Sequence, residues 1–300
     1  MSDTVIGAPA APATPPTLVH NSIVVQRGRC FTPVMGGTAA RRDDLVPELN
    51  GRACWQSSGV ARGRTLLVFC TDVEMADGPP GFGFHVVGTT LATFDATTLA
   101  FRARAPLPFA EPAGVQWGTG AVRVGDWVYV YGAGSDAEYV ARVRFDRVAT
   151  GPWTFWTGST WGARAALAPM TFAGGAPAMP AFVTSTGPGF VAVAFARALP
   201  DPAIAGWTAR APEGPWRALG TVATATRSAQ QFAYAARAVD LGRAGWAIVY
   251  NVNDPSAAAP DQTTYGGRFV PAPRRVRERR TGAASDAGLR SPSGSRDRRG

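Results

Sequence analysis

Three acidic residues stand at matching places after two runs of alternating apolar residues. Asp72 follows the first run, and Asp136 and Glu138 follow the second. Cleavage of a glycosidic bond needs one carboxyl group that protonates the leaving oxygen and another that activates water or attacks the sugar. We therefore predict a catalytic pair made of Asp72 and either Asp136 or Glu138.

Aromatic and amide side chains recur at the same phase and could hold a sugar. Equal intervals separate Trp55, Trp117 and Met179. Flat rings stack on the apolar face of a sugar, while amides and carboxylates bind its hydroxyls. The predicted ligand-binding residues are Trp55, Gln56, Gln116, Trp117, Tyr234, Asn251, Asn253 and Asp254. The alternatives are tryptophans that pack between sheets and aspartates that form turns.

The elements that position these residues are four similar groups of strands. Their central strands are 66–69, 127–131, 190–194 and 246–250, spaced by roughly 60 residues. Gly-Pro-Trp recurs at 151–153 and 214–216, each time before an outer aromatic strand. Units of about four strands at this period are typical of β-propeller blades, which gather equivalent loops around one axis.

Composition agrees with an all-β chain and marks its two ends. The sequence has 35 Gly, 25 Pro and 46% hydrophobic residues, without an apolar run long enough to span a bilayer. We expect a disordered Ala/Pro-rich segment over 1–17, a propeller domain over 18–273 and a disordered Arg-rich tail over 274–300. The tail carries most of the formal net charge of +9. Such a tail can bind polyanions, or it can simply be solvated.

Other chemistries find little support in the sequence. His20 and His85 lack nearby metal-ligand partners, so we expect no metal, and we expect no cofactor because phosphate-binding and dinucleotide motifs are missing. We also expect no specific nucleic-acid partner. Cys30 and Cys54 could form a disulfide, with Cys70 as a buried thiol. The chain as given shows no signal peptide.

Several segments resemble a bacterial five-bladed propeller family of formerly unknown function, the domain of unknown function 4185/5005 type. The segments are 21–26, 115–122, 129–132, 140–143, 250–253 and 265–269. The resemblance implies a relationship to endo-arabinanases and to arabinanase and xylosidase propellers, and an extracellular or cell-envelope location. It also implies that the first blade is incomplete here, because the family's Gly-Asp-Thr turn has no match before Asn21.

We therefore expect a five-bladed β-propeller of four-stranded blades, whose ring is closed by pairing of 21–26 with the last blade or with 267–270. It is expected to be a monomer that acts on, or binds, furanose-rich, arabinan-like oligo- or polysaccharides at the mouth of the axial channel. Two alternatives remain open, a catalytically inactive carbohydrate-binding propeller and a protein-interaction propeller.

Overall fold

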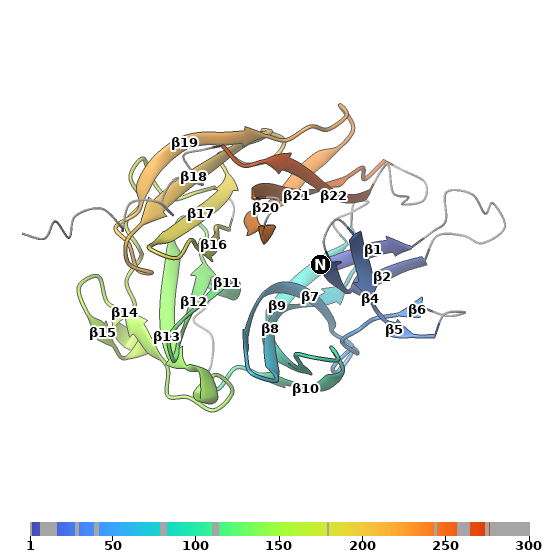
Figure 1. Ribbon diagram of the computed structural model, residues 1–300, viewed down its shortest axis with the longest axis horizontal. Coiled ribbons are helices and arrows are strands. Elements are labelled where there is room, and N and C mark those ends of the chain that lie inside the picture. The colour runs from blue at the N-terminus through green and yellow to red at the C-terminus, as the bar shows by residue number, and fades with distance from the viewer. Residues whose placement is uncertain are drawn as a thin grey trace, which may run out of the picture.

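The computed structural model describes residues 2–6, 17–27, 30–38, 42–78, 83–109, 114–178, 180–242, 245–256, 265–273 and 276. Four sheets of three to five strands stand around one axis in the predicted propeller arrangement (Figure 1). Two 3-10 helices, η1 (Phe145–Arg147) and η2 (Arg164–Ala166), interrupt the strands. No helix in these residues is long and apolar enough to cross a membrane.

Each sheet is an antiparallel meander of strands that follow one another in the chain. The first holds β7 (Ala53–Arg62), β8 (Thr65–Met75), β9 (Phe84–Asp95) and β10 (Phe101–Pro106). The second holds β11 (Gln116–Val124), β12 (Trp127–Ala133), β13 (Glu138–Arg144), β14 (Thr154–Trp156) and β15 (Trp161–Gly162). The third holds β16 (Phe182–Ser185), β17 (Phe190–Phe195), β18 (Ala203–Ala209) and β19 (Arg217–Thr224). The fourth holds β20 (Phe232–Asp240), β21 (Trp246–Asn253) and β22 (Tyr265–Pro271).

The four alternating runs seen in the sequence are the second strands of these sheets, β8, β12, β17 and β21. The inner strands β7, β11, β16 and β20 precede them, and neighbouring inner strands contact one another from β7 through to β20. Equivalent positions of the repeat therefore meet around one axis, as the spacing predicted.

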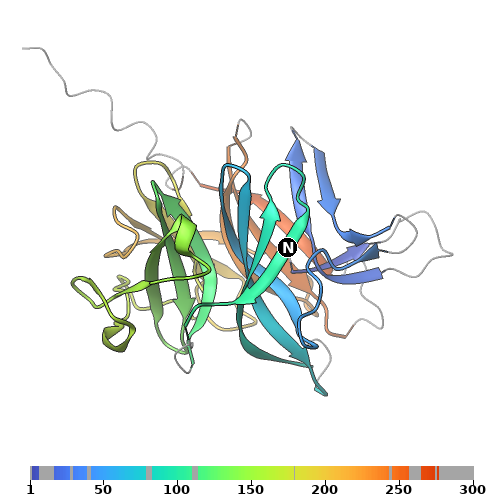
Figure 2. The ribbon, with the colours of Figure 1, turned by 90° about the horizontal axis from the view of Figure 1, so that it is seen from below.

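Three two-stranded ribbons precede the four sheets. They pair β1 (Ser2–Ile6) with β2 (Thr17–Asn21), β3 (Ile23–Arg27) with β4 (Cys30–Val34), and β5 (Gly36–Gly37) with β6 (Arg42–Asp43). Figure 2 places these N-terminal strands together on one side of the molecule. Residues 2–6 thus form a strand within the segment 1–17 that we expected to be disordered. Antiparallel pairing of their backbone with β2 supplies hydrogen bonds that composition does not reveal.

The predicted closure of the ring is wrong. Residues 23–27 pair with β4, and β22 pairs with β21, so 21–26 joins neither the last sheet nor 267–270. Instead β1 contacts both β22 and β7, so that the β1–β2 ribbon lies between the fourth and first sheets (Figure 1). The described residues contain no fifth sheet of three or more strands, and a five-blade count stays a prediction.

The hydrophobic core consists of separate clusters between neighbouring sheets. The cluster between the first and second sheets includes Phe69, Trp117 and Phe155, and the next includes Tyr131 and Trp207. A further cluster joins the third and fourth sheets. The other face of the first sheet packs against Val46, from the segment between β6 and β7, and against Ile23 and Val34 of the β3–β4 ribbon. Because the clusters fill the space between successive sheets, the inner strands are held in fixed positions around the axis.

Bulges interrupt three of the inner strands at similar places. The register shifts between Gln56 and Ser58 in β7, between Trp117 and Gly120 in β11, and between Tyr234 and Arg237 in β20. In β11 the bulge contains Gly118 at φ 80°, where an added Cβ would lie 2.5 Å from the Phe69 Cβ. Bulges re-aim the side chains that follow them, so residues past each bulge no longer obey simple alternation.

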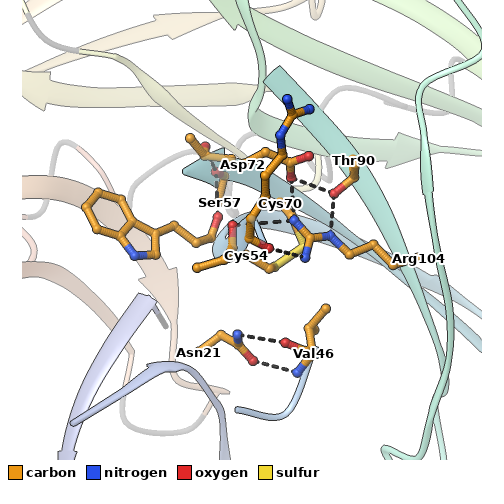
Figure 3. The surroundings of a disulfide bond; sticks show 12 residues. Asn21, Val46, Cys54, Ser57, Cys70, Asp72, Thr90 and Arg104 are labelled. Carbon is orange, nitrogen blue, oxygen red and sulfur yellow. Dashed lines mark hydrogen bonds and ion pairs between the residues drawn. A yellow bond between two sulfur atoms is a disulfide. The ribbon is translucent and has the colours of Figure 1, made fainter. Parts of the chain in front are cut away.

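The disulfide joins Cys54 on β7 to Cys70 on β8, and Cys30 is free and exposed (Figure 3). Our predicted pairing of Cys30 with Cys54 is wrong. Gln56 lies opposite Cys70 in the ladder, which brings Cys54 and Cys70 to adjacent strands with a Cα–Cα distance of 5.0 Å. Cys30 belongs to the separate β3–β4 ribbon, and Cys70, which we expected to be a buried thiol, is the partner of Cys54.

Of the predicted C-terminal tail, the structure describes Val276. This residue is 3% exposed and belongs to the cluster between the third and fourth sheets. An apolar side chain within the Arg-rich sequence thus contacts the core, and the boundary at 273 stays a prediction. The remainder of the predicted tail lies outside the described residues.

Candidate functional site

A series of hydrogen-bonded polar side chains links the first and second sheets where their inner strands approach the axis. The amide Nε2 of Gln116, at the start of β11, donates to Thr71 Oγ1 at 2.6 Å. Ser57, in the bulge of β7, shares a hydrogen bond of 2.7 Å between its Oγ and the same Thr71 oxygen. Ser58 Oγ donates to the Gly118 carbonyl oxygen at 2.7 Å, which fastens the two inner strands together.

Arg237 brings the third and fourth sheets into this group. It follows the bulge of β20, and its guanidinium lies 4.5 Å from the centroid of the Phe182 ring on β16. Its Nη1 donates to the Ser57 carbonyl oxygen at 3.4 Å. Burial lowers the pKa of Arg237 to about 10, which still leaves it charged at neutral pH. We define the axial cluster as Ser57, Thr71, Gln116, Phe182 and Arg237, to which all four sheets contribute.

Glu138 lies next to the axial cluster, because it is hydrogen-bonded to the residue that precedes Phe182. It begins β13, is 3% exposed, and its Oε1 accepts a hydrogen bond from the Ala181 backbone N–H at 2.9 Å. Ala181 directly precedes Phe182 of the axial cluster. Burial raises the pKa of Glu138 to about 8, against the opposing effect of the hydrogen bond from Ala181. Its carboxyl group is therefore mainly protonated at pH 7.

Asp72 occupies a different environment from the one predicted. Its Oδ1 accepts hydrogen bonds from Arg104 Nη2 at 2.7 Å and from Thr90 Oγ1 at 2.6 Å (Figure 3). The side chains of Asp72 and Arg104 are only 6% and 2% exposed. Arg104 also donates to the carbonyl oxygens of Pro47 and Arg52. This buried ion pair ties the first sheet to the preceding segment, so the geometry argues for a structural Asp72 and against the predicted catalytic role.

Asp136 is exposed in the turn between β12 and β13, where its Oδ2 accepts a hydrogen bond from Ser135 Oγ at 3.1 Å. Glu138 follows two residues later as the first residue of β13, where it is buried, so the two acidic residues lie in different environments. Asp254 acts as a turn residue, because its Oδ1 accepts from both the backbone N–H and the Oγ of Ser256. The alternative reading of Asp254 as a turn former thus matches the structure.

The two predicted tryptophans are not equivalent. Trp117 is 0% exposed and packs edge-on against Phe109 and Phe155, so its faces are unavailable to a sugar. The predicted stacking role is wrong for this residue, because the bulge after it turns its ring into the core between sheets. Trp55 is half-buried and contacts Phe84 at 4.5 Å between ring centroids. Gln56 is 7% exposed and lies within the first sheet.

The remaining predicted residues lie on the fourth sheet. Tyr234 and Asn251 are opposite each other in the ladder between β20 and β21, and Asn253 is opposite Phe232. All of these are half-buried, and the Tyr234 and Phe232 rings lie 5.5 Å apart. They surround the start of the inner strand that carries Arg237. Met179 lies outside the described residues.

Sequence reasoning missed Arg237 and Phe182, which complete the axial cluster. Alternation along β20 could not place Arg237, because the bulge contains Ala235 with φ 54° and changes which residues face the axis. The sequence feature that could have identified Arg237 is that it is a single arginine within a mostly apolar strand. Groups of three or more His, Cys, Asp or Glu side chains able to hold a metal ion do not occur among the described residues.

Comparisons with known proteins agree with the fold. No curated protein matches the chain. A candidate hydrolase from Bacteroides ovatus is similar in structure, with a TM-score of 0.66, 15% identity, and coverage of 89% of this chain and 80% of its own. The Cellvibrio cellulosa α-L-arabinanase complexed with arabinohexaose gives a TM-score of 0.46 at 7% identity, covering 72% of each chain. The likeness to the Bacteroides ovatus structure speaks for the architecture alone.

The strongest assignment comes from sequence. A family profile covers residues 3–264, which takes in the N-terminal ribbons and nearly all of the four sheets. This chain therefore belongs to the family described as Domain of unknown function (DUF5005).

Proposed function

We propose that this chain is a glycoside-hydrolase-like propeller that binds an oligo- or polysaccharide over the axial cluster. The supporting observation is the convergence of hydroxyl, amide, guanidinium and aromatic groups from all four sheets. Ser57, Thr71 and Gln116 offer donors and acceptors that suit sugar hydroxyls, and half-buried Trp55 and Tyr234 offer rings near the same strand ends. Binding without cleavage is the activity that this arrangement supports best.

Furanose-rich, arabinan-like oligosaccharides are the first ligands to test, because the family resemblance points to them. Isothermal titration with arabinohexaose is expected to show saturable binding that Gln116→Ala weakens by roughly tenfold, the effect of one lost polar contact of about 1.4 kcal/mol. The matched control is Arg144→Gln. Arg144 is exposed and ends β13, at the opposite end of that strand from Glu138. Equal binding by both variants and the unchanged chain, or no binding at all, contradicts the proposal.

Hydrolysis is a second candidate function, favoured by one specific observation. Glu138 is protonated at neutral pH, the state that a general acid needs in order to protonate a leaving oxygen. Its carboxyl group is 3% exposed, however, so a substrate oxygen reaches it only after the structure around Ala181 opens. Asp136, in the turn just before β13, is the proposed second carboxylate. Glu138→Gln and Asp136→Asn should each abolish any release of reducing ends while binding persists.

The proposed location is extracellular or at the cell envelope, where polysaccharide substrates occur, and the proposed solution state is a monomer. Size-exclusion chromatography with light scattering tests the latter. A molecular mass close to 31.4 kDa supports it, and twice that mass overturns it.

A further inference from the structure

Arg237 is a charged group inside the ring whose hydrogen-bonding capacity is largely unused. A guanidinium carries five N–H donors in a fixed planar arrangement. The structure gives Arg237 one hydrogen bond, the 3.4 Å contact with the Ser57 carbonyl oxygen, and none of the carboxylates in the described residues pairs with it. Its electrostatic neighbour is instead the face of the Phe182 ring.

Such an arrangement lowers the stability of the folded state unless an opposite charge compensates for it. A partly desolvated cation without an opposite charge destabilises the folded state, and a cation–π contact with phenylalanine compensates for only part of that cost. The fold could have relieved this cost with a nearby carboxylate, as it does for Arg104, which pairs with Asp72 and donates to backbone carbonyls. At the axis, the compensating anion is missing from the described part of the chain.

We propose that Arg237 receives the carboxylate of an acidic sugar, so that the saccharide bound at the axis contains a uronic acid residue. This inference rests on the proposed carbohydrate-binding function and narrows its ligand. The planar guanidinium fits a carboxylate through two parallel N–H···O bonds, which a neutral hydroxyl cannot match. Phe182 covers one face of the guanidinium and leaves its donating edge for the ligand.

The neighbouring polar groups complete the recognition. Ser57 Oγ and the Gln116 amide meet at Thr71 Oγ1, so these three side chains hold one another in place next to the charged group. They supply hydroxyl-binding partners from the first and second sheets, whereas Arg237 supplies the positive charge from the fourth. A ligand with both a carboxylate and free ring hydroxyls uses both kinds of group, and a neutral sugar uses one.

The experiment compares trigalacturonate with its fully methyl-esterified form by isothermal titration calorimetry at pH 7, where the uronate is ionised. The unchanged chain is expected to bind the acid about 10–100-fold more tightly, the range for a charge-assisted bidentate contact of about 1.5–3 kcal/mol. Arg237→Gln should remove this preference, and Arg237→Lys should keep part of it. The matched control is Arg142→Gln, since Arg142 also lies over aromatic rings, those of Trp127 and Trp161.

Equal affinity for the acid and the ester, no binding of the acid, or an unchanged preference in Arg237→Gln overturns the inference. Arabinohexaose, titrated separately, distinguishes this failure from failure of the proposed function. Binding of arabinohexaose together with equal affinity for acid and ester overturns the uronate inference and leaves carbohydrate binding in place. Absence of binding to all three probes overturns both.

Melting temperature separates a ligand-binding role of Arg237 from a structural one. Arg237→Met removes an uncompensated charge and keeps much of the side chain's length, so it should leave the melting temperature unchanged or raise it while abolishing the preference for the acid. A loss of more than about 5 °C, about 2 kcal/mol for a chain of this size, identifies Arg237 as a structural residue and overturns the proposal.

Discussion

Two arginines of this propeller are held in opposite ways, and the difference separates its framework from its candidate site. Arg104, on β10, is bonded to Asp72, Thr90 and backbone carbonyls, and its side chain is 2% exposed. Arg237, on β20, has one long hydrogen bond and an aromatic ring. A saturated buried cation fixes the fold, whereas an unsaturated one at the centre of the ring is available to a ligand.

The same contrast applies to the acidic residues. Asp72 accepts hydrogen bonds from Arg104 and Thr90 through one oxygen, Oδ1, and so has a cationic partner next to the disulfide of the first sheet (Figure 3). Glu138 uses one oxygen, Oε1, to accept a hydrogen bond from Ala181, while its buried Oε2 has no hydrogen-bond partner in the structure. The carboxyl group without a cationic partner among the described residues is the one whose pKa burial raises to about 8. Asp72 and Arg104 compensate each other's charge, whereas Glu138 and Arg237 each lack an oppositely charged partner among the described residues, which makes them the groups near the axis that are open to chemistry.

The first prediction compares the two arginines by replacing each of them in a separate variant. Arg104→Met leaves Asp72 as an uncompensated buried charge, which should lower the free energy of unfolding by about 3–5 kcal/mol. Arg237→Met leaves no such charge behind and should change it by less than about 1 kcal/mol. Urea unfolding followed by tryptophan fluorescence measures both values. Similar losses in the two variants mean that the two arginines have the same structural role.

The sequence predicted the framework better than the site, and particular residues explain why. The repeated strands placed β8, β12, β17 and β21 correctly, because alternation and spacing are local properties. The same spacing placed Gln116 near the axis and, through the turn after β12, Glu138. It failed at Trp117 and Arg237 because bulges change the facing of the inner strands, and those bulges depend on contacts between sheets.

Asp72 and the cysteines show a second limit of sequence reasoning. Asp72 occupies the position of the repeat that we expected to line the channel. Arg104, 32 residues further along the chain, instead donates a hydrogen bond to it. Cys54 and Cys70 become partners through the ladder register of β7 and β8, which the spacing of three cysteines does not encode. Long-range partners decide the role of each of these residues, and composition and periodicity carry no information about them.

The second prediction tests whether the disulfide belongs to the framework. The bridge closes a loop with a sequence separation of 16, for which loop-closure entropy predicts a contribution of about 3 kcal/mol. The double variant Cys54→Ser, Cys70→Ser should lose this amount in urea unfolding without loss of arabinohexaose binding. Cys30→Ser, at the free and exposed cysteine, is the control and should behave as the unchanged chain. Equal destabilisation by the control shows that a different pairing exists in solution.

The third prediction uses the pKa of Glu138. Because the folded-state pKa of about 8 lies above the ordinary glutamate pKa of 4.5, the folded chain holds a proton that the unfolded chain loses between these pH values. The stabilising effect of that proton is complete below pH 4.5 and is lost as the pH rises through 8. Glu138→Gln, which stays neutral, should therefore gain stability over the unchanged chain with rising pH, by about 5 kcal/mol between acid pH and pH 9.

Unfolding in urea at pH 5, 7 and 9 measures this difference, with exposed Ser159→Ala, which removes no titratable group, as the control. A constant difference between Glu138→Gln and the unchanged chain means that Glu138 is ionised in the folded state at neutral pH. Hydrolysis by proton donation from this residue then loses its support.

The smallest expected effect compares two threonines, one in each region, that are both 4% exposed. Thr90 bonds Asp72 at 2.6 Å and accepts from Arg104 Nε at 2.8 Å, so Thr90→Val leaves two charged groups short of a partner and should cost about 1.5–3 kcal/mol. Thr71→Val removes the partner of Ser57 and Gln116, which are half-buried and can bond water instead, so its cost should be about 0.5 kcal/mol. In ligand titrations the order should reverse, because only Thr71 holds the axial cluster in place. A variant of Thr90 that weakens binding more than Thr71→Val shows that the ligand lies over the first sheet and not at the axis.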